Sequence, residues 1–180
     1  MRPLTQKEAQ IFFEKLSKFI GDNGKALIER EDGTWIFAIH NKRVYYMKEE
    51  LLNLCKPFSF PLILSAGICM GKFTKTGRFF LQITALPIIA PYAQYKVWLK
   101  QSAELGFLYG QHILNEGIET MTEGTPKNVG VVVYNHNNLP IGLGVALQDS
   151  VQRRLASPTI MVVARQADLG EYLRSESNIA

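Results

Sequence analysis

The chain has 180 residues, of which 47% are apolar and 20% are charged, and its formal net charge is +4. This balance is typical of a folded globular protein and excludes a disordered, collagen-like or coiled-coil chain. Two cysteines, Cys55 and Cys69, are too few for a disulfide scaffold and fit a reducing compartment. No apolar run reaches the length of a membrane span, and the N-terminus lacks the form of a signal peptide, so we expect no membrane partner.

The positive charge lies in the first half of the chain. Residues 1–92 have a net charge of +5, whereas residues 93–180 have a net charge of −1. Residues 51–103 contain six basic residues and no acidic residue. Such a stretch projects positive potential wherever it folds, which indicates either a polyanionic partner or a solvated basic face. Charge alone does not separate these two interpretations.

The first half begins with a helix and continues mainly with strands. Thr5 and Glu8 have the spacing of a capping box, and the apolar residues after them recur at a helical period until Gly21 ends the pattern. We expect strands at 34–40, 43–47, 61–69 and 78–84, a short helix at 49–55 and a polar turn at 72–77. Residues 86–93 read as an apolar connector with two prolines, and we expect the domain boundary just after it.

The second half is predicted to be mostly strands. They are expected at 95–100, 130–134, 140–147 and 159–164, with one short helix at 107–117. Short strands at this spacing indicate a small barrel or sandwich. The predicted fold class is therefore α+β: an N-terminal α/β domain with an antiparallel sheet and helices, residues 1–93, followed by a C-terminal β-barrel domain, residues 94–180.

No sequence motif predicts a cofactor, a metal or a catalytic site. Gly67–Thr74 approaches a phosphate-binding loop, but only three residues separate its glycines and a phenylalanine follows Lys72. The histidines lack ligand spacing, so we expect no metal site. Asp168 and Glu171 are close together near the C-terminus, where helix capping or solvation explains them better than acid–base catalysis.

Several basic residues are candidates for contacts with RNA phosphates. Some surround the predicted 72–77 turn, some flank Trp98, and two occupy a predicted loop between strands of the second half. They are Lys72, Lys75, Arg78, Lys96, Lys100, Arg153 and Arg154. Trp98 itself suits base stacking, but tryptophans are highly buried on average, so we favour burial against the neighbouring domain.

Six blocks of sequence together resemble one protein family. They are GKFTKTGRF, ITAL, APYAQYKVW, FLYG, PIGLGVA and RQADLGEYLR, in this order. They resemble the Nip-seven family of large-ribosomal-subunit biogenesis factors, and the resemblance covers nearly the whole chain. The second half is similar to a PUA domain, a small RNA-binding β-barrel. The resemblance therefore implies that residues 94–180 form a PUA domain.

The family resemblance implies a nucleolar protein without catalytic activity that acts in pre-rRNA processing. It implies binding to single-stranded, uridine-rich pre-rRNA and to pre-ribosomal assembly factors, exosome subunits among them. Among the basic candidates it favours Arg153 and Arg154. The chain departs from many relatives at Gln148, where they have lysine, and at Gln101, where they have proline.

Two alternative functions remain open from the sequence. PUA domains often accompany RNA-modifying enzymes, although the first half offers little space for a catalytic domain. A scaffold that binds only proteins, with negligible RNA affinity of its own, is the second alternative. We expect a monomer in either case.

Overall fold

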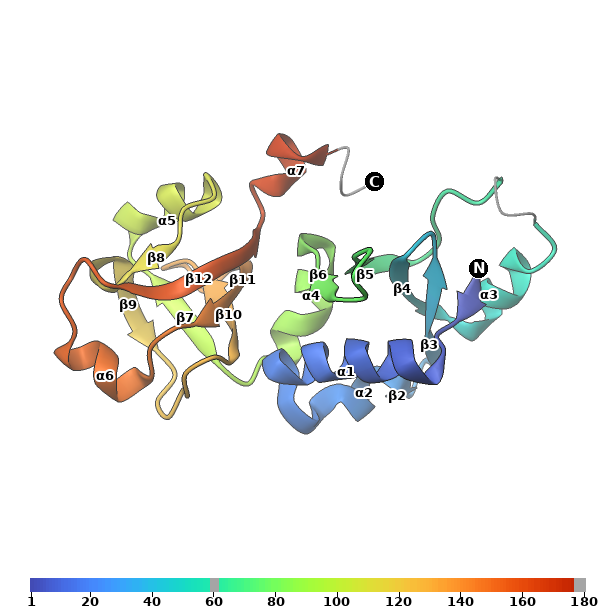
Figure 1. The fold of residues 1–180 in the computed structure, drawn as a ribbon, viewed down its shortest axis with the longest axis horizontal. Coiled ribbons are helices and arrows are strands. Elements are labelled where there is room, and N and C mark those ends of the chain that lie inside the picture. The colour runs from blue at the N-terminus through green and yellow to red at the C-terminus, as the bar shows by residue number, and fades with distance from the viewer. Residues whose placement is uncertain (59–61, 177–180) are drawn as a thin grey trace.

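The computed structural model describes residues 1–58 and 62–176. Figure 1 shows two lobes side by side along the long axis of the molecule. The N-terminal lobe comprises the elements from β1 to η4, and the C-terminal lobe comprises those from β7 to α7.

The elements of each lobe follow in chain order. The N-terminal lobe contains β1 (Arg2–Pro3), α1 (Gln6–Ile20), η1 (Gly21–Gly24), α2 (Lys25–Ile28), β2 (Glu29–Arg30), β3 (Gly33–His40), β4 (Arg43–Lys48), α3 (Glu49–Cys55), β5 (Ile68–Phe73), β6 (Phe79–Leu81), η3 (Ile83–Ala85), α4 (Leu86–Ile89) and η4 (Ala90–Tyr92). The C-terminal lobe contains β7 (Lys96–Leu99), α5 (Gln101–Leu108), β8 (Ile113–Leu114), η5 (Asn115–Gly117), β9 (Ile118–Met121), β10 (Gly130–Tyr134), β11 (Pro140–Ala146), α6 (Ser150–Leu155), β12 (Met161–Asp168) and α7 (Glu171–Arg174).

The N-terminal lobe is an antiparallel sheet with α1 packed on one face. Its strand order is β1-β3-β4-β5-β6, and β2 pairs with β3. The predicted capping box is present: the Glu8 backbone N–H donates to the Thr5 hydroxyl, and the Thr5 N–H donates to the Glu8 carboxylate. Phe12 and Phe19 of α1 are fully buried in the apolar core. The predictions of α1, β3, β4 and α3 are confirmed.

The predicted strand at 61–69 is wrong, and residue 61 lies outside the described residues. The strand in this region is β5, which starts at Ile68, because that position brings Met70 into the core beneath α1. Leu62 and Leu64 stay 71% and 88% exposed. The turn after β5 covers only Thr74–Gly77, so Lys72 lies in the strand rather than in the turn.

The predicted strand at 78–84 and the predicted connector at 86–93 also differ from the structure. β6 stops at Leu81, and the chain continues as the helical turns η3, α4 and η4. Leu86 and Ile89 are buried in these turns. The segment is therefore part of the core and not an exposed linker.

The C-terminal lobe is a nearly closed, barrel-like sheet. Its strand order is β8-β12-β11-β10-β7-β9, in which β7 and β10 are parallel and the other pairs are antiparallel. The predicted strands that correspond to β7, β10 and β11 are confirmed, and β12 extends beyond its predicted end to Asp168.

The predicted helix at 107–117 is wrong. The helix is α5, which begins at Gln101 and ends at Leu108. Gly110 has φ of +96°, a conformation that ends a helix and that glycine adopts without steric cost. Residues Ile113–Leu114 then pair with β12 as strand β8. Arg153 and Arg154, predicted to lie in a loop, instead belong to the short helix α6.

The two lobes share one apolar core. Phe12, Leu16 and Phe19 of α1 join the α4 residues Leu86 and Ile89 in it. The residues that the C-terminal lobe contributes are Val132, Tyr134, Leu143 and Ala167. Among the described residues, no helix is long and apolar enough to cross a membrane.

The capping box gives the fold a testable dependence on pH. The Arg2 guanidinium, 2.7 and 2.8 Å from the Glu8 carboxylate oxygens, lowers the pKa of Glu8 from 4.5 to about 2, and Thr5 acts in the same direction. Because the folded-state pKa is the lower one, this stabilisation is present above the unfolded pKa and disappears as the pH falls from about 5 to 2. Glu8→Gln should lower the free energy of unfolding at pH 7 by about 1 kcal/mol. Urea denaturation of the wild type and Glu8→Gln between about pH 5 and pH 2 is the measurement. A difference in unfolding free energy that stayed constant over this pH range would contradict the assignment.

Candidate nucleic-acid interface

Helix α6 carries the two arginines that the sequence favoured. The Asp149 carboxylate caps its N-terminus by accepting hydrogen bonds from the backbone N–H groups of Val151 and Gln152, at 2.9 and 2.6 Å. Arg153 and Arg154 follow in the last turn, where cations interact favourably with the helix dipole. The Asp149 cap and the two arginines thus stabilise α6 locally, in a segment that we expected to be a loop.

Arg153 is anchored to the barrel. Its Nε donates to Oδ1 of Asn115 at 3.0 Å, and its Nη2 donates to the backbone oxygen of Ile118 at 3.1 Å. The Asn115 side chain also donates to the backbone oxygens of Arg153 and Ala156. Burial lowers the pKa of Arg153, and the neighbouring positive charge of Arg154 lowers it further. Arg153 therefore holds α6 in place, and this role competes with contact to a ligand.

Arg154 points into solvent. Its side chain is 71% exposed and lies 3.2 Å from the Glu123 carboxylate, which is itself 88% exposed. Exposed ion pairs of this kind contribute little to stability, so an incoming phosphate competes with Glu123 on favourable terms. Arg154 is thus the accessible member of the arginine pair.

Lys96 is the first residue of β7, and Lys100 follows its last residue. Lys100 is exposed at the start of α5 and lines a cavity of about 550 Å³ together with Gln111, His112 and Glu116. This volume is in the range of sites that hold small ligands. The Lys96 ammonium instead lies 5.5 Å from the centre of the Tyr134 ring.

Trp98 is half-buried rather than fully covered by the neighbouring domain. Its ring stacks on Tyr134 with a centroid distance of 5.6 Å, and it packs against the core shared by the lobes. Its Nε1 donates to Oδ1 of Asn138 at 2.9 Å. One face and the polar edge of the indole are thus engaged within the protein.

The remaining candidates belong to the N-terminal lobe. Lys72 is exposed in β5, and Lys75 and Arg78 are exposed in and just after the β5–β6 turn. Figure 1 places α6 at the outer end of the C-terminal lobe, well away from β5 and β6. The predicted RNA-binding residues therefore do not form one cluster but lie on separate surfaces.

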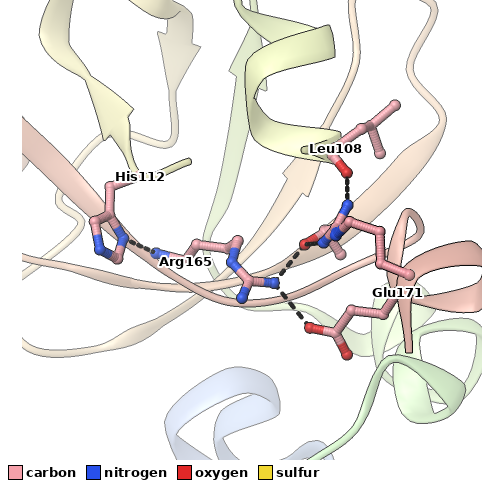
Figure 2. A network of polar contacts seen from close by, with 6 residues as sticks. Leu108, His112, Arg165 and Glu171 are labelled. Atoms are coloured by element: carbon pink, nitrogen blue, oxygen red, sulfur yellow. Dashed lines mark hydrogen bonds and ion pairs between the residues drawn. The ribbon is translucent and has the colours of Figure 1, made fainter. Parts of the chain in front are cut away.

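A buried ionic network occupies the end of β12, and the interpretation of Asp168 as a capping or solvated residue is wrong. Asp168 is completely buried and accepts hydrogen bonds from the guanidinium groups of Arg165 and Arg174. Arg165 also donates to the Glu171 carboxylate at 2.8 Å and, through its backbone N–H, to Nδ1 of His112 at 3.1 Å. Figure 2 shows these contacts converging between the end of α5 and α7.

This network ties three segments of the lobe together. Arg174 of α7 donates to the backbone oxygen of Leu108, the last residue of α5, as well as to Asp168 of β12. Sequence reasoning missed Arg165 and Arg174, although the alternating charges of RQADLGEYLR were a signal for internal pairing. Among residues 1–58 and 62–176, no group of three or more acidic, histidine or cysteine side chains is arranged to hold a metal ion.

Comparisons with known proteins identify the family. The model described as "NIP7/UPF0113, pre-PUA domain" matches residues 1–83, and the model described as "UPF0113 PUA domain" matches residues 95–177. The "60S ribosome subunit biogenesis protein NIP7 homolog" of Danio rerio is 51% identical over 179 residues, which cover 99% of each chain. The chain belongs to the NIP7 family. The relative from Sus scrofa with the same name is 49% identical over the same extent.

Solved structures share the fold of this NIP7-family chain. A PUA domain protein from Aeropyrum pernix superposes with a TM-score of 0.62 at 17% identity, covering 99% of this chain and 90% of that one. A conserved PUA domain protein from Thermoplasma acidophilum gives a TM-score of 0.58 at 18% identity, with 96% and 95% covered. The predicted α+β fold class with a C-terminal PUA barrel is confirmed.

Removal of the central carboxylate of the ionic network should strongly destabilise the C-terminal lobe. Asp168→Asn keeps the side-chain volume but leaves Arg165 and Arg174 without their shared carboxylate, which should cost about 3 kcal/mol of unfolding free energy. Urea denaturation measures this loss. Glu171→Gln is the matched control, because Glu171 is 21% exposed and contacts only one arginine of the network. Equal effects of the two substitutions would contradict the central role of Asp168.

The two arginines of α6 should differ in their effect on stability. Arg153→Ala removes the donors to Asn115 and Ile118 and should lower the unfolding free energy by about 1.5 kcal/mol. Arg154→Ala breaks only an exposed ion pair and should change the unfolding free energy by less than about 0.5 kcal/mol. Thermal melts of the single variants test this order, and a larger loss for Arg154→Ala would overturn it.

Proposed function

We propose that this protein is a non-catalytic RNA-binding adaptor in the biogenesis of the large ribosomal subunit. The observation that carries the proposal is its identity of about half over the full length with proteins named as 60S ribosome subunit biogenesis factors. The PUA domain supports the RNA-binding part, because PUA barrels commonly recognise RNA. Under this proposal the protein acts in the nucleus and nucleolus.

The proposed RNA is single-stranded pre-rRNA, with a preference for uridine-rich segments. Arg154 and Lys100 are the exposed cations that the C-terminal lobe offers among the candidate residues. Lys–phosphate and Arg–phosphate contacts provide sequence-independent attachment. Binding would hold a pre-rRNA segment in a conformation that processing enzymes use, so occupancy rather than bond chemistry is the proposed mechanism.

The N-terminal lobe is proposed to dock pre-ribosomal assembly factors, exosome subunits among them, with the protein itself a monomer. Leu54 is 69% exposed and Phe58 is 58% exposed at the end of α3 and just beyond it, and large apolar side chains gathered at a surface are typical of protein-binding sites. These side chains support protein contacts in the N-terminal lobe.

A scaffold that binds only proteins is the second candidate. Two observations favour it: Arg153 is committed to internal hydrogen bonds, and the C-terminal half of the chain has a net charge of −1. Both reduce the electrostatic attraction that the PUA lobe offers to RNA.

A salt titration of RNA binding separates the two candidates. The probe is a fluorescent single-stranded oligouridylate, and the variant is Lys100→Ala/Arg154→Ala. Loss of two phosphate contacts should reduce the slope of log K against log salt by about 1.4 for a single strand. Lys7→Ala/Lys18→Ala, which removes two exposed lysines from α1, is the matched control and should leave the slope unchanged.

Two other outcomes of this titration would redirect the proposal. A slope that is equal for the wild type and the Lys100→Ala/Arg154→Ala variant would contradict RNA attachment through the PUA lobe. Absence of binding by the wild type at low salt would favour the protein-only scaffold.

A further inference from the structure

The sheet of the N-terminal lobe has one face buried beneath α1 and a second face that is partly open. Phe79 and Leu81 of β6 point to the buried face and are 5% and 3% exposed. Phe80, between them, must point to the opposite face because side chains alternate along a strand. It is 46% exposed on the edge strand of the sheet.

Strand register places a row of cations beside Phe80. Lys72 of β5 is directly opposite Phe80 of β6, and Arg43 of β4 is directly opposite Lys72. Residues directly opposite in antiparallel strands share a face, with Cβ atoms about 5 Å apart. Arg43, Lys72 and Phe80 therefore form one row across three strands, and Lys72 and Phe80 are both exposed.

Further cations surround the end of this row. Arg78 precedes Phe80 by two residues and so lies on the same face of the chain as it enters β6. The β5–β6 turn is fixed by hydrogen bonds between Thr74 and Arg78, and it carries Lys75. The Phe73 N–H donates to the Lys42 backbone oxygen at 2.7 Å, which brings the β3–β4 turn alongside.

The strands that form this row and their neighbour β3 supply no carboxylate to it. Strands β3, β4, β5 and β6 contain no acidic residue. Within the described part of the chain, the exposed Lys42, Lys72, Lys75 and Arg78 form no ion pair with an acid, in contrast to Arg154, which is paired with Glu123. The row has the composition that single-stranded nucleic acid requires, which is an exposed aromatic ring among cations.

We propose that this face of the N-terminal lobe is a second binding site for single-stranded RNA, in which a base stacks on Phe80 and the flanking phosphates contact Lys72 and Arg78. The inference rests on the proposed function, because it assigns part of the RNA attachment to a different lobe. One aromatic ring surrounded by cations favours RNA over a protein partner, whose docking surface would present several apolar side chains.

Substitution of Phe80 tests the site. In the full-length protein, Phe80→Ala should weaken binding of a ~12-nucleotide oligouridylate by about 5- to 100-fold, and Phe80→Tyr should restore it, because stacking on an aromatic ring contributes this much per base. Fluorescence anisotropy at low salt is the measurement. The matched control is Ile28→Ala, because Ile28 is 39% exposed in the same lobe but lies in α2, outside the sheet.

A photo-crosslink to the wild-type protein tests the site without requiring a variant to fold. An oligonucleotide that contains 4-thiouridine should crosslink to the peptide with Phe80 in the wild type. Equal RNA affinity of wild type and Phe80→Ala, or crosslinks confined to the C-terminal lobe, would overturn this site while leaving RNA binding by the PUA lobe intact. If Phe80→Ala captured fewer partner proteins than the wild type but kept its RNA affinity, the RNA site would also be overturned, in favour of a protein-docking surface. Absence of RNA binding by the wild type would overturn both this site and the proposed function.

Discussion

The packing of α1 against β10 is the contact on which the arrangement of the two lobes depends. The Phe19 ring lies so close to Gly130 that a Cβ atom at this position would be 2.6 Å from the ring. The Gln94 N–H donates to the Phe19 backbone oxygen at 2.9 Å, and the Tyr134 hydroxyl donates to the Ala90 backbone oxygen at 3.2 Å. Apolar packing and these two hydrogen bonds thus join the lobes through one continuous core. Close-packed interiors of this kind resist relative movement of their parts.

Local sequence patterns predicted the elements whose stability is mainly local. Helix α1 has its capping box and its amphipathic period in its own residues, and β3 and β4 have turn residues between them. The patterns failed where tertiary contacts decided the structure. Residues 86–92 read as a connector because their prolines and apolar residues have no regular period, yet they form helical turns that bury Leu86, Ile89 and Ala90 in the shared core. The segment 107–117 failed because Gly110 ends α5 and β12 recruits Ile113 as a strand partner.

Sequence reasoning selected candidate residues but could not predict their surroundings in the fold. Sequence reasoning selected Arg153 and Arg154 as a pair, whereas the structure divides them into an anchor bonded to Asn115 and a solvent-facing charge. It selected Lys72 for its place in a turn, whereas the relevant property is its position in a strand opposite Phe80. Both differences concern pairs of residues that are far apart in the sequence and meet only through strand register or through the closure of a long loop. A single sequence does not show which distant residues come into contact.

The shared core also determines how the two lobes would act on one RNA molecule. A flexible linker would let each surface reach a range of distances, and the effective concentration of the second contact would then fall gradually as the RNA segment lengthened. Here α4 and η4 replace such a linker, and the separation between α6 and the β5–β6 hairpin is fixed by packing. The distance between the two surfaces would therefore select RNA by length. A segment that can span this distance would bind both surfaces and gain avidity, whereas a segment that is too short or too stiff to reach both would bind only one of them.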